Sequence, residues 1–116
     1  FDYGDSIRFG AASTGVEESQ DICLDLHLFE VYTRGFLSAA SLTDTELEML
    51  PLSAIAITIE LATRFLKDHL DGDRYFKISY PNQNLERTRG QIRLAADMLR
   101  KLDDMCSIVD KILEEK

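Results

Sequence analysis

Residues 50–80 read LPLSAIAITIELATRFLKDHLDGDRYFKISY and predict one strongly apolar helix, a sharp stop and a short extended return. Pro51 suits the first helical turn, where a missing N–H costs nothing. Beyond it, apolar residues recur at helical spacing, at Leu52, Ile55, Ile59, Ala62, Leu66 and Leu70, with Ile57, Leu61 and Phe65 beside them. Because this stripe is wide, we expect the helix to be buried on most sides. Gly72 is the natural left-handed residue after the last turn, and the return over 75–80 has strand-like aromatic and β-branched character.

One cation interrupts the apolar helix. Arg64 lies between Leu61 and Phe65, and burying a guanidinium without a partner carries a large desolvation cost. Arg64 therefore reaches an acid, snorkels to an edge of the fold, or faces a pocket. The residues alone favour an ion pair or a snorkelling side chain over a pocket, and they leave all three open.

The composition limits the classes of function. With 116 residues the chain is a single domain or a fragment of one, and a 45% share of apolar residues is enough for a core. A net charge of −8 argues against non-specific nucleic-acid binding and against an anionic membrane surface, since both need a basic surface. No apolar run approaches the ~20 residues of a membrane-spanning helix. We therefore expect neither nucleic acid nor a membrane among the partners.

The cysteines and the first residues bear on the compartment and on the extent of the chain. Cys23 and Cys106 have no metal-ligand spacing with each other or with His27 and His69, which predicts reduced thiols in a cytoplasmic protein and no metal site. The chain opens with FDYGDSIRFG, which is neither a secretory signal nor a start at methionine. This opening favours a fragment whose N-terminal part is absent.

Local signals divide the chain into three parts. Residues 1–20, rich in glycine, serine and threonine, predict a loop, and residues 21–80 predict a helical core with the short extended return. Residues 81–116 predict one long C-terminal helix, which runs from about Asn84 to Leu113. Its apolar positions keep a heptad repeat, with Leu85, Ile92, Leu99, Cys106 and Leu113 on one line and Ala95, Leu102 and Val109 between them. Packing along its own domain is the favoured use of this seam, and a coiled-coil contact with a second copy is the alternative.

Start signals place two further helices within residues 21–80. Asp25 is expected to cap a helix over 26–39, after a short extended segment at 22–24. Thr43 and Glu46 form a capping box, which predicts the start of a short helix over 44–49.

Few residues of this chain could carry chemistry by themselves. Asp2-Tyr3-Gly4 invites comparison with the magnesium-binding Asp-Phe-Gly of protein kinases, but no glycine-rich phosphate loop, strand lysine or His-Arg-Asp loop accompanies it. His27 and His69 belong to no acid–histidine–nucleophile pattern, and we expect them to be packing or surface residues. The residues alone therefore predict a mostly helical domain and no particular activity.

Four segments, taken in order, resemble a known family. The chain is similar to the C-terminal part of the aminoglycoside phosphotransferases and choline kinases through FDYGDSIRFGA, LDLHLFEVYTRGFL, ELEMLPLSAIAITIELATRFLKDHLDGDRYFKI and NLERTRGQIRLAADM. Within that family it most resembles the bacterial N-acetylhexosamine 1-kinases, some of which are labelled mucin-desulfation proteins. The resemblance extends to about Met98, and its most specific pieces are residues 2–10 and 64–77.

The resemblance implies a mainly α structure, the helical subdomain of the C-terminal lobe of a protein-kinase-like fold, with one or two short extended segments. In such kinases the catalytic and metal-binding aspartates lie upstream of the Asp-Phe-Gly-Asp type segment, so Asp2 is given no magnesium role and this chain is expected to hold no catalytic residue and no metal ligand. By resemblance, Asp5 and Arg8 support the active-site loop. Arg64 and Tyr75 are similar to the residues that hold the oxygens of the sugar.

The function that this resemblance implies is that of a sugar-kinase fragment. The parent enzyme would use Mg²⁺ and ATP to transfer the γ-phosphoryl group to the anomeric hydroxyl of an N-acetylhexosamine, a reaction of carbohydrate metabolism. This part would supply acceptor binding and scaffold, and without the missing N-terminal part of the kinase it is expected to be inactive and to bind no cofactor. Two alternatives stay open: a helical interaction module that self-associates through the 92–113 seam, and an enzyme whose acceptor is choline or an aminoglycoside.

Overall fold

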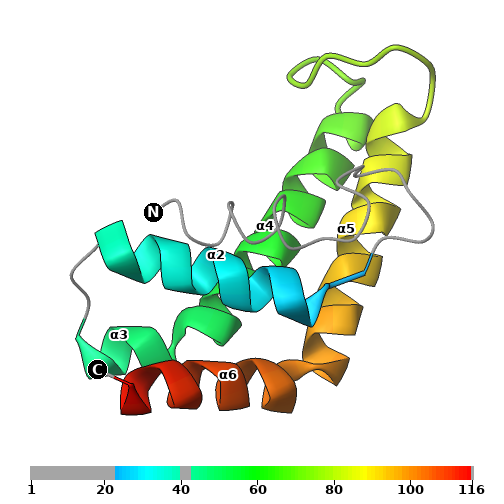
Figure 1. Cartoon of the computed structure of the whole chain (residues 1–116). Coiled ribbons are helices and arrows are strands. Elements are labelled where there is room, and N and C mark those ends of the chain that lie inside the picture. The colour runs from blue at the N-terminus through cyan, green and yellow to red at the C-terminus, as the bar shows by residue number, and fades with distance from the viewer. Residues whose placement is uncertain (1–22, 40–42, 116) are drawn as a thin grey trace.

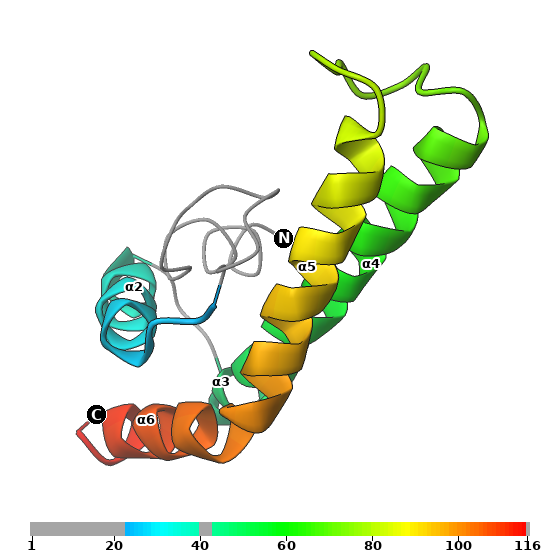
Figure 2. The same ribbon diagram turned by 90° about the vertical axis from the view of Figure 1, so that its right-hand side faces the viewer.

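The computed structural model describes residues 23–39 and 43–115, and these residues form five helices. They are α2 (Leu26–Ala39), α3 (Asp44–Glu48), α4 (Leu50–Leu70), α5 (Gln83–Arg100) and α6 (Leu102–Glu114). The helices α4 and α5 form an antiparallel hairpin, and α2, α3 and α6 gather at the end of the hairpin that lies opposite the α4–α5 connection (Figure 1, Figure 2). The predicted mainly α class is confirmed, and the kinase-like lobe stays a prediction.

Two predicted helix starts are confirmed by their hydrogen bonds. At the start of α2, the Leu28 N–H donates to Asp25 Oδ1 at 3.1 Å. At the start of α3, the Glu46 N–H donates to Thr43 Oγ1 at 3.2 Å, and the Thr43 N–H donates to Glu46 Oε1 at 3.0 Å. These bonds satisfy N–H groups that have no partner within their helices, so the short-range signals were sufficient here.

The core lies at the end of the hairpin where α2, α3 and α6 pack. Its buried members are Leu24, Phe29, Leu47, Leu50, Ala54, Ile55, Leu94, Met98, Met105 and Val109. This cluster takes residues from every described helix, so it fixes one end of the α4–α5 hairpin. The other end projects from the rest of the fold and carries the connection between the two helices (Figure 2).

The helix α4 is less buried than its apolar stripe predicts. Its buried face contains Leu50, Pro51, Ala54, Ile55, Thr58, Ala62, Phe65 and Asp68. On the neighbouring face, Leu52, Ile59, Leu66 and Leu70 are between 38% and 75% exposed. The prediction of burial on most sides is therefore wrong, because over most of its length α4 packs on a single partner, α5, and one helix covers one face.

The predicted extended return is not a strand. Residues 71–82 form turns and bends, and the described part of the chain contains no strand beyond a single-residue bridge at Leu24. The backbone N–H groups of residues 74–76 donate to the carboxylate of Asp68 instead of to a neighbouring strand. The aromatic and β-branched composition that predicted a strand is therefore overridden by one side chain.

The predicted single C-terminal helix is two helices that change direction at Lys101 (Figure 2). This change of direction lets α6 bury Val109 in the core. The heptad seam over 92–113 therefore does not form one continuous surface, because Ile92 and Leu99 are each 55% exposed whereas Val109 is buried.

A buried carboxylate joins the α5–α6 corner to the segment before α2. Asp97 Oδ2 accepts from the Leu24 N–H at 2.7 Å and from Lys101 Nζ at 2.7 Å, and Lys101 Nζ also donates to the Leu24 carbonyl at 2.6 Å. Burial alone would raise the pKa of Asp97, but the bonds from Lys101, Leu24 and Arg100 outweigh it and hold this pKa below its usual value. The corner thus depends on partners that lie far apart in the sequence.

Candidate functional site

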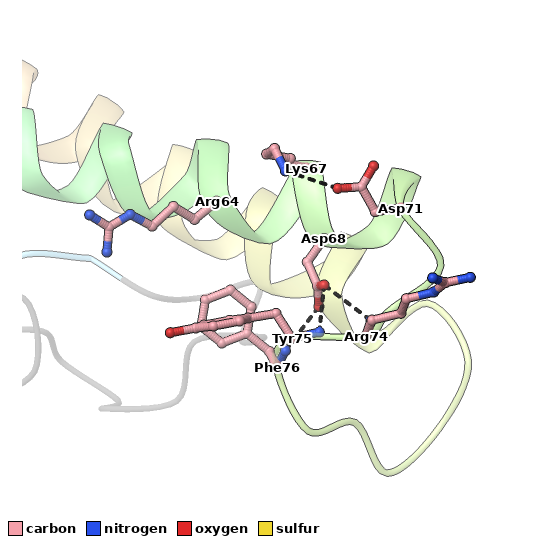
Figure 3. Close-up of a pocket in the computed structure, with 7 residues that line it drawn as sticks. All are labelled: Arg64, Lys67, Asp68, Asp71, Arg74, Tyr75 and Phe76. Atoms are coloured by element: carbon pink, nitrogen blue, oxygen red, sulfur yellow. Dashed lines mark hydrogen bonds and ion pairs between the residues drawn. The ribbon is translucent and has the colours of Figure 1, made fainter.

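A pocket lies at the free end of the α4–α5 hairpin. It has a volume of about 710 Å³ and is lined by Arg64, Lys67, Asp68, Asp71, Arg74, Tyr75 and Phe76 (Figure 3). The first three residues come from the last turns of α4, and the other four come from the connection to α5. The pocket therefore exists only if the connection folds back along α4.

The turn after α4 sends the chain back toward the helix. Gly72 has φ +100°, as its left-handed prediction requires, and Asp73 follows with φ +60°. The Gly72 N–H donates to the His69 carbonyl at 3.2 Å, and the Asp73 N–H donates to the Asp68 carbonyl at 2.8 Å. This pair of bonds is the Schellman arrangement, which satisfies the last carbonyls of the helix and reverses the chain.

Asp68 then holds the returning segment. Its two carboxylate oxygens accept from the N–H groups of Arg74 at 3.1 Å, Tyr75 at 2.8 Å and Phe76 at 3.0 Å. Burial would raise the pKa of Asp68, but these three bonds, together with one from Asn84, lower this pKa below its usual value. The group is therefore an anion at neutral pH, and a buried anion is stable here because its donors surround it.

Aromatic contacts hold the other side of the same segment. The Phe76 ring packs on Phe65 with centroids 4.7 Å apart, and the Tyr75 ring meets Phe76 edge-on at 4.9 Å. The guanidinium of Arg87, from α5, lies 5.6 Å from the centroid of the Phe65 ring. This contact ties α5 to the aromatic pair at the end of α4.

Arg64 and Tyr75, predicted by resemblance to bind the sugar, line the same pocket. In Figure 3 their polar ends extend in the same direction, away from Asp71 and Arg74. The apolar neighbours of Arg64 predict that it is buried, but 64% of its side chain is exposed. Its guanidinium pairs with Glu60, one turn earlier on α4. Exposed pairs of this kind are weak, so the guanidinium can exchange Glu60 for a ligand at little cost. The role of both residues in binding stays a prediction.

The other predicted site residues, Asp5 and Arg8, lie outside the described residues. His69 Nδ1 lies 3.3 Å from Asp73 Oδ1 and His27 is exposed. Within residues 23–39 and 43–115, no three side chains of histidine, cysteine, aspartate or glutamate are placed to hold a metal ion together. In the same ranges, no helix has the length and hydrophobicity needed to cross a bilayer.

Sequence reasoning missed Asp68, on which the pocket depends. A signal was present, because an acid three residues after Phe65 falls on the buried face of α4, just ahead of a glycine turn. A buried acid needs donors, and the nearest unpaired ones are the N–H groups of a returning loop. The Lys67–Asp71 ion pair, at 3.0 Å, was also not predicted, and both of its side chains are exposed.

A second, apolar hollow lies between α4 and α5. It has a volume of about 290 Å³ and is lined by Ile59, Ala62, Thr63, Leu66, Thr88, Ile92, Ala95, Ala96 and Leu99. Four of these, Ile59, Leu66, Ile92 and Leu99, are among the exposed large apolar residues of the described chain. We call this surface the α4–α5 groove.

Comparison with protein families adds no assignment, since no family model matches the chain.

Proposed function

We propose that this chain is the acceptor-binding and scaffolding part of a sugar kinase that phosphorylates the anomeric hydroxyl of an N-acetylhexosamine. The observation that carries the proposal is the shared pocket of Arg64 and Tyr75 at the free end of the hairpin. These two residues are eleven positions apart in the sequence, and both are similar to the residues that hold the oxygens of the sugar in the N-acetylhexosamine 1-kinases.

The pocket has the chemistry that a neutral, oxygen-rich ligand needs. The guanidinium of Arg64 is a planar set of donors for hydroxyl or acetamide oxygens, and the phenol of Tyr75 can both donate and accept. The exposed ring of Tyr75 also offers an apolar face for the C–H side of a sugar ring. A volume of about 710 Å³ lies within the ~300–1,000 Å³ typical of small-molecule sites.

The charges of the lining disfavour the alternative acceptors. Two of the pocket's cations have acidic partners, Lys67 in Asp71 and Arg64 in Glu60, and the remaining acid of the lining, Asp68, accepts from backbone N–H groups. Choline carries a fixed positive charge and aminoglycosides carry several, and the lining holds no carboxylate without a partner to pair with them. A neutral N-acetylhexosamine needs no such carboxylate.

In the proposed parent enzyme, this chain would bind and orient the acceptor and would carry out no step of phosphoryl transfer. By resemblance, Mg²⁺ and ATP are held by groups upstream of this sequence, where they supply the phosphoryl group and neutralise its charge. Arg64 and Tyr75 would hold the sugar so that its anomeric hydroxyl faces the bound ATP. Positioning of this kind is a large part of catalysis when the chemistry belongs to the donor and the metal.

The test is acceptor binding by the 116-residue chain itself. ¹⁵N-labelled chain is titrated with N-acetylglucosamine, N-acetylgalactosamine, choline or kanamycin, and amide shifts are followed by NMR. We expect saturable shifts with an N-acetylhexosamine at residues 64–68 and 74–76, and no saturable shifts with choline or kanamycin. Shifts of these amides with choline or kanamycin alone would reverse the choice of acceptor, and no saturable shifts with any ligand would refute the proposal.

A second candidate function, self-association, is favoured by the α4–α5 groove. The exposed pairs Ile59/Leu66 and Ile92/Leu99 each have the seven-residue spacing of packed helices, so the hairpin of a second copy carries stripes that match them. In this proposal the two copies meet through the α4–α5 groove, because the 92–113 seam is not one continuous surface. Sedimentation at micromolar concentration should then show a dimer that Leu99→Glu abolishes and Leu70→Glu, outside the groove, preserves. A monomeric wild type would exclude this function.

A further inference from the structure

We propose that Asp68 is a positioning residue of the acceptor site and that Asn84 acts with it, so that Tyr75 stands beside Arg64 before any ligand binds. The identity of the ligand rests on the proposed function. The conformation of the loop does not, and it can be measured without a ligand.

The first step is the saturation of the Asp68 carboxylate. Oδ1 accepts from the N–H groups of Arg74 and Tyr75, and Oδ2 accepts from the Phe76 N–H and from Asn84 Nδ2 at 2.8 Å. A carboxylate offers about four acceptor positions, and all four are used here. Asp68 therefore lines the pocket without an acceptor left for a sugar hydroxyl, and its action on a ligand must pass through the loop.

The second step is the weak hold on the Tyr75 side chain. The residue is 83% exposed, and its ring packs edge-on against Phe76. The ring is therefore placed by its backbone, and that backbone is fixed at the Tyr75 N–H by the 2.8 Å bond to Asp68. Without this bond the segment would have to be ordered at the moment of binding, which weakens affinity.

The third step is the link to α5. Asn84 is fully buried, and its Nδ2 donates to Asp68 Oδ2 at 2.8 Å and to Asp73 Oδ1 at 3.1 Å. Its Oδ1 accepts from Arg87 Nη1 at 2.9 Å, and the same nitrogen donates to the Lys77 carbonyl at 3.1 Å. The loop is thus attached to both helices of the hairpin, so its position follows theirs.

The substitution Asp68→Asn tests the proposal because it changes few atoms. An amide in the same place presents an NH₂ group to two of the four donors, so at least two hydrogen bonds are lost while the volume stays the same. The matched control is Asp97→Asn. Asp97 is buried to the same extent, 6% exposed, and also accepts a backbone N–H, but it lies in the last turn of α5, away from the pocket.

Two measurements on the 116-residue chain decide the matter: amide hydrogen exchange at residues 74–76, and the Kd for N-acetylglucosamine. In Asp68→Asn we expect faster exchange at these amides and a Kd raised about tenfold, because ordering of the loop then accompanies binding. In Asp97→Asn the global stability should fall while the Kd stays within about twofold of wild type. Asn84→Ala removes one of the four donors to Asp68, and its Kd should lie between those of wild type and Asp68→Asn.

The outcomes separate this inference from the proposed function. If the wild type binds and Asp68→Asn binds as tightly, or if Asp97→Asn weakens binding equally, the positioning role is overturned and the proposed function stands. If the wild type binds no N-acetylhexosamine, the proposed function and the acceptor role of Asp68 are overturned together. Slow exchange at residues 74–76 in Asp68→Asn would contradict the hold on the loop whatever the ligand.

Discussion

Arg64→Ala in the longer kinase that is proposed to contain this chain should raise the KM for the sugar far more than the KM for ATP. The fold should tolerate the change. Arg64 is on the surface, its partner Glu60 is also exposed, and pairs of this kind four residues apart contribute roughly 0.3–0.5 kcal/mol. The loss of stability is therefore too small to unfold the enzyme.

The effect on binding follows from the donors that are removed. A hydrogen bond from a charged group to a neutral ligand contributes about 1.5–3 kcal/mol. Part of this is offset in the wild type because Arg64 must release Glu60, so we expect the sugar KM to rise about 10- to 100-fold. ATP does not touch this end of the hairpin in the proposed arrangement, so its KM should change less than about twofold.

The assay is coupled detection of ADP while the concentration of one substrate is varied and that of the other is saturating. Arg100→Ala is the matched control. Arg100 is also an exposed arginine in a helical ion pair, but it is the last residue of α5 and lies at the end of the hairpin away from the pocket. It should leave both KM values near those of wild type. Equal increases of the two KM values in Arg64→Ala would refute the sugar role, and so would an unchanged sugar KM.

Three further predictions concern the 116-residue chain. Incubated with Mg²⁺, ATP and N-acetylglucosamine, it should form no sugar phosphate, and ATP-dependent product detected by ³¹P NMR would contradict its assignment as an acceptor-binding part. The folded pKa values of Asp68 and Asp97 lie below the usual 3.8, so their stabilisation should be complete above about pH 5 and lost as the pH falls through the folded values. Asp97→Asn should therefore flatten the acid side of a plot of Tm against pH, and an unaltered slope would show that Asp97 is not one of the groups responsible. Met98→Ala, at a fully buried core position, should lower the free energy of unfolding by about 2–5 kcal/mol in urea, and a loss below 1 kcal/mol would contradict the core assignment.

The elements that could be predicted from the sequence are those whose causes are local. The capping box of Thr43 and Glu46, the cap at Asp25 and the left-handed Gly72 each depend on residues within a few positions, and each is confirmed. The pairing of Arg64 with an acid was one of three outcomes left open, and the partner found, Glu60, is also local.

The features that could not be predicted depend on partners far along the chain. The side chain of Lys101, where the helix breaks, donates to the carbonyl of Leu24, 77 residues away, and nothing in the heptad pattern of 81–116 indicates this contact. The exposure of Ile59 depends on how many helices pack against α4, and the apolar periodicity of α4 does not indicate that number. In the candidate site, residues predicted to form a strand form a turn because their N–H groups donate to Asp68. These donors follow Asp68 by six to eight residues and lie outside α4, so the periodicity of the helix does not indicate them.

The side chains of the pocket itself offer the most direct test of its role as an acceptor site. Arginine Nε–Hε resonances of the ¹⁵N-labelled chain can be recorded during a titration with N-acetylglucosamine and assigned by single Arg→Lys substitutions. We predict a saturable shift of the Arg64 resonance together with the Tyr75 ring protons, while the resonances of Arg34 and Arg100 stay in place. A titration that leaves the Arg64 and Tyr75 signals unmoved, or that moves those of Arg34 and Arg100 equally, would contradict acceptor binding in this pocket.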